Sequence, residues 1–186
     1  NSNHIYFKYP NLAKELVVTC VNQLWVCDIT YIYATDDKFC YLHLVTDAFS
    51  RMIIGYVLAP TLEAKYTIEA LQQAISHAGS GNLCGTIHHS DRGVQYCCDE
   101  YITLLKEHHI RISMTEDSNP TDNGMAERVN GIIKNEFLEP LQTPKNLLEA
   151  LPLVDHAVRT YNTLRPHLNL NMRTPAQVYE GKQIIL

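Results

Sequence analysis

Three acidic residues lie in sequence contexts that could bring their carboxylates together. Asp28 sits inside an apolar, β-branched stretch, Asp91 follows a short stretch of the same kind, and Glu127 opens an amphipathic segment. Carboxylates that converge from separate elements repel one another unless they bind a cation. Oxygen ligands of this kind suit Mg²⁺ or Mn²⁺, which share their coordination with phosphate. Two such ions can activate an attacking oxygen and stabilise a leaving one, so the pattern points to phosphodiester chemistry.

A helix is predicted to present Glu127 from its first turn. Turn-forming residues lead up to Gly124, and apolar residues then recur at helical spacing. Asn130, Gly131 and Lys134 follow Glu127 by three, four and seven positions, so they share its face of the helix. A solvated helix face has the same appearance, and only the two aspartates favour a functional site over that interpretation.

The elements that would position these residues predict an α/β fold. A mixed five-stranded sheet is expected from the order β-β-β-α-β-α-β-α-α, with the first three strands antiparallel and with helices on both faces. Asp91 then lies at the carboxyl end of a strand, where such sheets place their chemistry. Asp28 is mid-strand and faces the same way as Val26 and Thr30. The predicted strands are 24–34, 39–47, 52–58, 85–90 and 110–115, and the predicted helices are 62–78, 99–108, the Glu127 helix, 143–161 and a short one after Pro175.

Composition limits the class of protein. The 186 residues suffice for one domain, predicted as a lead-in segment over 1–22 and a single core over 23–182. No run of about 18 apolar residues predicts a membrane span, and no apolar signal segment opens the chain. The six cysteines then read as reduced thiols of a cytoplasmic protein. A net charge of −5 argues against nucleic-acid binding, unless bound metals or other parts of a longer protein offset it.

A zinc site is not expected from the paired histidines and cysteines. His88-His89 and Cys97-Cys98 are adjacent pairs. Neighbouring residues on a strand point to opposite faces, and neither pair has the spacing of zinc ligands.

Three motifs, taken in order, resemble the catalytic core of retroviral integrases and, more closely, that of bacterial insertion-sequence transposases with an integrase-type core. The family pattern is D-x-T-Y, then H-S-D-x-G-x-Q-Y, then a glutamate after a D-N pair. Here these are Asp28 to Tyr31, His89 to Tyr96, and Asp122-Asn123 followed by Glu127, with 35 residues between Asp91 and Glu127. The tail YNTLRPHLNLNMRTPAQVY resembles the family's ending, and the resemblance covers most of the chain.

This resemblance implies a ribonuclease H-like fold and metal-dependent DNA cleavage and strand transfer. Asp28 and Asp91 would hold Mg²⁺ or Mn²⁺, two ions in the active complex, and Glu127 would complete the site. Lys134 would meet a DNA phosphate, and Gly93 would let the backbone approach the substrate. DNA and further copies of the chain are the implied partners. By motif alone, the other supporting or DNA-facing residues are Thr30, Gln95, Tyr96, Asn123 and Asn130.

Several alternatives stay open from the sequence. Another ribonuclease H-like nuclease, or a non-catalytic assembly domain, would share parts of the pattern. Asp47 reads as a turn residue, and the tail from Tyr161 to His167 could contact DNA, although packing of the last helices on the core is favoured. The loop 115–123 is expected to be the most mobile part of the site. The helix-turn-helix region of such transposases is not expected before Leu24.

Overall fold

A computed structural model describes residues 5–79, 83–116 and 123–181. These residues form one five-stranded sheet in the order β3-β2-β1-β4-β5. The strands are β1 (Leu24–Ala34), β2 (Lys38–Asp47), β3 (Ile53–Ala59), β4 (Ile87–Ser90) and β5 (Arg111–Met114). β1, β2 and β3 pair antiparallel, while β4 and β5 join the other side of β1 in parallel. The predicted mixed sheet is therefore confirmed.

The parallel register between β1 and β4 places two of the three acidic residues. Val26 pairs with His89, and it is the last pair of the two strands. Asp28 and Asp91 each follow their member of that pair by two residues. Because parallel strands advance together, the two aspartates leave this junction side by side.

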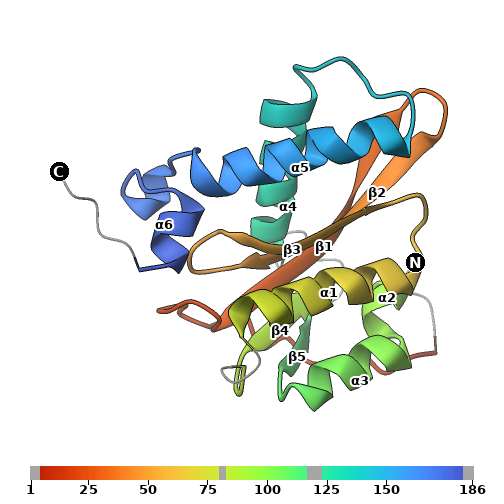
Figure 1. Ribbon diagram of the computed structural model, residues 1–186. Coiled ribbons are helices and arrows are strands. Elements are labelled where there is room, and N and C mark those ends of the chain that lie inside the picture. Colours follow the sequence, from red (N-terminus) through yellow and green to blue (C-terminus); the bar gives the residue numbers. More distant parts are fainter. Residues whose placement is uncertain (1–4, 80–82, 117–122, 182–186) are drawn as a thin grey trace.

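Helices cover both faces of the sheet, as predicted (Figure 1). α1 (Ala64–Ala78), α2 (Val94–Cys97) and α3 (Asp99–Glu107) lie on one face, over a core that includes Trp25, Leu71 and Tyr101. On the other face lie α4 (Gly124–Ile132), the π-helical segment η1 (Ile133–Leu138) and α5 (Leu147–Thr163), around Leu42 and Tyr161. The chain closes with the 3₁₀ turn η2 (Leu168–Leu170) and α6 (Pro175–Tyr179). Alternating residues of β1 serve the two cores, as its pleat requires.

Some element boundaries differ from those predicted. α5 begins at Leu147 rather than near Thr143, because the Asn146 side chain accepts a hydrogen bond from the Glu149 amide and caps the helix there. α2 was not predicted, since a single turn carries no periodicity. The Glu127 helix changes to π geometry at Ile133, which its apolar spacing does not reveal.

The described part of the lead-in segment packs on the core instead of standing apart. Leu12 and Leu16 contact a small apolar cluster with Val26. The Leu12 amide donates to the Ser113 hydroxyl at 2.8 Å. The predicted domain boundaries are not otherwise tested and stay a prediction. No helix in the described ranges is both long and apolar enough to cross a membrane.

Contact between β3 and α1 depends on Gly55. A Cβ atom at this position would lie 2.1 Å from the Ala70 carbonyl oxygen, so helix and strand touch backbone to backbone. We predict that Gly55→Ala destabilises the fold by about 3 kcal/mol or more, because overpacking against backbone cannot relax through a side chain. Gly131→Ala is the control: it is helical with open space around its Cα, and a gain of about 0.5–1 kcal/mol is expected. Urea unfolding measures both, and equal effects would contradict the close packing.

Candidate active site

Asp28 is the central acidic residue of the site. Its side chain is half-buried on the α4 face of β1, where the Asn130 amide group donates to Asp28 Oδ2 at 2.7 Å. The pKa of Asp28 is raised to about 6, chiefly by burial and also by the negative charges of Asp91 and Glu127, while hydrogen bonds from Ile29 and Asn130 act in the opposite direction. Asp91 and Glu127 therefore both lie close enough to Asp28 for their charges to act on it.

Asp91 is held at the end of β4 by its own turn. The Gly93 amide donates to Asp91 Oδ1 at 2.9 Å. A Cβ atom at position 93 would lie 3.0 Å from that oxygen and 3.1 Å from Gln95 Oε1. The Gly93 backbone is extended, so the glycine is needed for space and not for an unusual conformation. Gly93 therefore allows the Asp91 and Gln95 side chains to fold back over the turn.

Glu127 extends from the first turn of α4 and is exposed. The start of this helix is tied to the sheet by Asn123, whose side-chain amide donates to the Cys27 carbonyl at 3.1 Å. Since Cys27 precedes Asp28, this bond fixes the helix that carries one carboxylate against the strand that carries another. Residues 117–122 of the loop expected to be mobile lie outside the described residues.

The three carboxylates lie in one region but are not arranged as a complete set of metal ligands. Within the described ranges, no three histidine, cysteine, aspartate or glutamate side chains are gathered tightly enough to hold a metal ion. Glu127 is exposed and can change rotamer toward half-buried Asp28, whereas the exposed Asp91 side chain is held by the Gly93 amide. The oxygen donors and their mutual repulsion fit a hard divalent cation, which would neutralise them on binding.

Burial changes the interpretation of several residues predicted to face DNA. Tyr96, Asn123 and Asn130 are each less than a tenth exposed, and Thr30 is also buried. Tyr96 packs edge-on against Tyr101 with ring centroids 5.6 Å apart. A direct DNA contact through these side chains does not fit their burial. Their burial is compatible with the other role that their motifs allow, which is to support the site.

Gln95 and Lys134 occupy different surroundings from one another. Gln95 donates to the Leu62 carbonyl at 3.0 Å and so links α2 to the segment that enters α1.

Lys134 is half-buried and lines a groove of about 400 Å³ together with Tyr31, Tyr33 and other residues. Its ammonium group has no ion pair among the described residues, so it remains available to an anion.

Both histidines of the adjacent pair are buried and hydrogen-bonded. His88 Nε2 lies 2.7 Å from the Tyr101 hydroxyl, and His89 Nδ1 lies 2.8 Å from the Ser113 hydroxyl. Asp47, predicted as a turn residue, is instead the last residue of β2, and its buried carboxylate accepts bonds from the Ser50 amide and hydroxyl in the turn that follows.

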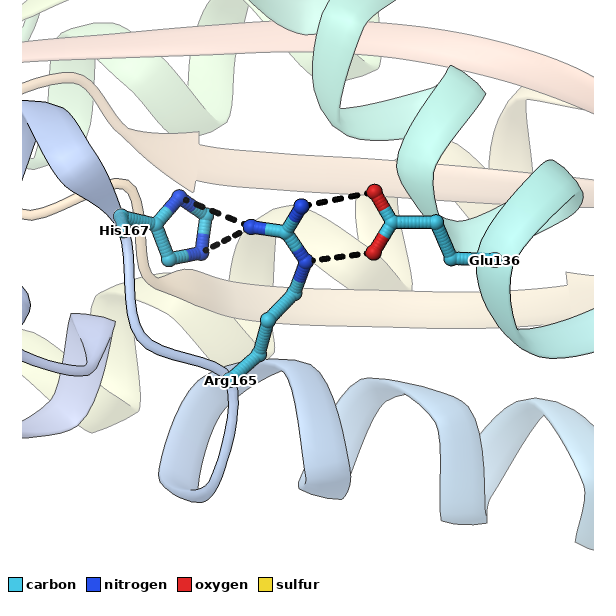
Figure 2. A network of polar contacts seen from close by, with 3 residues as sticks. All are labelled: Glu136, Arg165 and His167. Carbon is cyan, nitrogen blue, oxygen red and sulfur yellow. Dashed lines mark hydrogen bonds and ion pairs between the residues drawn. The ribbon is translucent and has the colours of Figure 1, made fainter.

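The tail motif holds the last helices on the core. Asn162 bonds the Ile53 backbone in both directions, donating at 2.9 Å and accepting at 3.0 Å. Arg165 makes a bidentate pair with Glu136 at 2.6 and 2.7 Å, and its third nitrogen faces the His167 ring (Figure 2). This pairing lowers the pKa of the Glu136 carboxyl. The predicted packing role of the tail is confirmed.

Comparison with known proteins places these features in context. Residues 18–120 match a family model described as an integrase core domain, and residues 108–175 match a second model with the same description. The chain is 33% identical over 182 residues to the uncharacterized 31 kDa protein of insertion element IS600 from Shigella sonnei, covering 97% of this chain and 65% of that protein. It is 32% identical over 164 residues to the transposase for insertion sequence element IS629 from Shigella sonnei, covering 88% and 54%.

A solved structure shows the same fold. The HTLV-2 integrase catalytic core domain in complex with magnesium superimposes with a TM-score of 0.64 at 26% identity, covering 86% of this chain and 97% of that one. The ribonuclease H-like fold predicted from the motifs is therefore confirmed. The chain spans between about half and two thirds of the length of the two relatives from insertion elements.

Neutralising Asp28 is predicted to stabilise the metal-free protein. The folded-state pKa of about 6 lies above the ordinary value of 3.8, so ionisation favours unfolding. This penalty develops as the pH rises from about 4 to about 6 and is then complete, at about 3 kcal/mol. Asp28→Asn keeps the shape and an acceptor for Asn130. We expect it to be more stable than the wild type at pH 8 in a chelator, with the gain shrinking toward pH 4.

Urea unfolding at both pH values measures this difference. Asp36→Asn, at an exposed turn aspartate, is the control and should show no such pH-dependent gain. A loss of stability at pH 8 in the Asp28 variant would contradict the prediction, because it would show that the ionised Asp28 carboxylate stabilises the fold.

Proposed function

Because this chain belongs to the integrase core domain family, we propose that it catalyses divalent-metal-dependent cleavage of DNA phosphodiester bonds and transfer of the cut strand to a second DNA site. This is the activity of a DDE-type transposase. The observation that carries the proposal is geometric: the β1–β4 register sets Asp28 and Asp91 side by side, and bonds from Asn123 and Asn130 hold α4, which carries Glu127, on β1 at Cys27 and Asp28.

The carboxylates of Asp28 and Asp91 are the proposed metal ligands, and Glu127 would complete the set from α4. Bound Mg²⁺ or Mn²⁺, two ions in the active complex, would increase the nucleophilicity of water or a 3′-hydroxyl and stabilise the leaving oxygen. The support is the donor set itself: three carboxylates of one sign, of which the most buried has a raised pKa that a bound cation would lower.

The neighbouring residues would keep these ligands in place. Asn130 donates to Asp28 Oδ2 and so holds this carboxylate in place. The Gly93 amide orients Asp91 from the same turn. Asn123 sets the position of α4 and hence of Glu127. Such fixed support matters because the attacking and leaving oxygens must be held in line with the reacting phosphate.

Lys134 is proposed to contact a DNA phosphate. It follows Glu127 along the same helical run, and an unpaired ammonium group positions DNA without reading its sequence. Since the chain corresponds to part of its relatives, the element ends, the target DNA and the oligomer with further copies belong to the proposal as well. The proposed activity would take place in the cytoplasm, where bacterial DNA is found.

Removal of any one carboxylate is predicted to abolish activity. Asp28→Asn, Asp91→Asn and Glu127→Gln should each lower strand cleavage and strand transfer by at least about a hundredfold. Each removes a proposed ligand of the metal that would stabilise the negative charge developing in the transition state. The assay uses labelled pre-cut and uncut DNA with Mg²⁺ or Mn²⁺. Glu100→Gln, an exposed position on α3, is the matched control and should retain activity.

The outcomes separate the rival functions. Cleavage without strand transfer of a pre-cut end would indicate another ribonuclease H-like nuclease. If the wild type neither cleaves DNA nor gains thermal stability from Mn²⁺, the non-catalytic assembly domain is the better description.

A further inference from the structure

A cavity of about 640 Å³ lies beside α4, on the side where α5 leads into η2. Its described lining includes three arginines, Arg51, Arg128 and Arg165, and no aspartate or glutamate. Gly124 and Met125, at the start of α4, also line it, so the cavity begins at the end of the helix that carries Glu127. A positive cavity is unexpected in a chain whose net charge is −5.

The three arginines are not equivalent. Arg165 is neutralised by its bidentate pair with Glu136 (Figure 2). Neither Arg51 nor Arg128 has an ion pair with a carboxylate among the described residues. The only side chain to which the Arg51 guanidinium donates there is Met125, through its sulfur, which is a weak acceptor. Two guanidinium groups that are not ion-paired within the described ranges therefore line one cavity.

Electrostatic effects on the neighbouring groups are consistent with a positive cavity. Burial lowers the pKa of Arg51, and the nearby charge of Arg128 lowers it further, although Tyr161 and the Asp47 carboxylate oppose this. The pKa of His167 is lowered first by burial and then by the charges of Arg165 and Arg51, despite an opposing effect of Glu136. A half-buried guanidinium beside a second one is stabilised when an anion binds between them.

The backbone conformation of Arg51 is a second, independent observation that points to a role for this side chain in the cavity. Arg51 ends the β2–β3 turn with a φ of +67°, a region that favours glycine or asparagine. A long side chain there adds strain of roughly 1 kcal/mol. The Tyr161 hydroxyl donates to the Arg51 carbonyl at 3.0 Å and holds this conformation. The turn thus directs an arginine into the cavity at a position where a smaller residue would be less strained.

We propose that Arg51 and Arg128 bind a phosphate group of the DNA backbone in this cavity, next to the phosphate that reacts at Glu127. Guanidinium groups suit this ligand because they donate two hydrogen bonds to phosphate in a fixed geometry. Arg128 directly follows Glu127, and successive residues of a helix point about 100° apart. One DNA strand could therefore pass from the carboxylates into the cavity along α4. The inference rests on the proposed function and adds a second phosphate anchor to the one proposed at Lys134.

The test is the salt dependence of DNA binding. The probe is a short labelled duplex of arbitrary sequence, since phosphate contacts do not depend on sequence. Anisotropy titrations in a chelator over a range of NaCl concentrations give the slope of log affinity against log salt. We expect Arg51→Gln and Arg128→Gln each to reduce that slope by about 1 and to weaken binding roughly tenfold near 0.1 M salt.

Arg159→Gln is the matched control. It removes the same charge from an exposed position on α5, where the arginine has only a solvent-exposed partner in Asp155. Its slope should stay within experimental error of the wild type. Slopes of the cavity variants equal to that of Arg159→Gln would overturn the proposal. Because Arg51 is half-buried, thermal unfolding checks its variant, and exposed Arg128 decides the question alone if that variant does not fold.

The two proposals fail in different ways. If the wild type cleaves DNA and the cavity variants bind as the control does, the phosphate site is wrong and the catalytic function stands. If DNA binding depends on Arg51 and Arg128 but Glu127→Gln leaves cleavage unchanged, the phosphate site stands and the catalytic assignment is wrong.

Discussion

The parallel pairing of β1 with β4 is the constraint on which the candidate site depends. It ends at Val26 and His89, and beyond that pair the two strands no longer bond to each other. Asp28 and Asp91 lie two residues past the end of the shared ladder. A slip of one residue in this register would turn one aspartate to the other face of the sheet. The two buried cores, on opposite faces of β1, therefore protect the register and with it the relation between the carboxylates.

Placing the charges of Asp91 and Glu127 beside half-buried Asp28 lowers the stability of the fold when Asp28 is ionised. Burial and the charges of Asp91 and Glu127 all favour the neutral form of Asp28. The protein offsets this with neutral donors: Asn130 bonds Asp28 directly, and Asn123 holds α4 on the strand. An arginine or lysine at position 130 would neutralise the charge more fully, but it would also compete with a bound cation. Asparagine supports the carboxylate and leaves its negative charge in place for the proposed metal.

The sequence predicted the parts of this site that depend on short-range patterns. Alternation along β1 placed Asp28 on the face of Val26, and helical spacing placed Asn130 on the face of Glu127. Both relations hold because they follow from the geometry of a single element. Burial of Tyr96 and Asn123 was not predictable in the same way. It depends on how α2 packs beneath the junction and how α4 meets β1, and these are long-range contacts that no local pattern encodes.

The arginine cavity illustrates the same limit for charge. Arg51, Arg128 and Arg165 come from a turn, a helix and a connection that are far apart in the chain, so no motif joins them. The overall charge of −5 even pointed away from a site for nucleic acid. Yet net charge averages over the whole surface, whereas a phosphate responds to the charges within about one Debye length, roughly 8 Å at physiological salt.

An acidic chain can therefore present both signs along one helix, as α4 does here with Glu127 and Arg128. The carboxylates would attract cations, and the arginines on the next flank would attract the phosphates on either side of the reacting one. Such an arrangement would bind a DNA strand most favourably when the cations and the DNA phosphates are bound at the same time. Binding of the metal and binding of DNA would then be coupled through charge, because each removes repulsion that otherwise opposes the other.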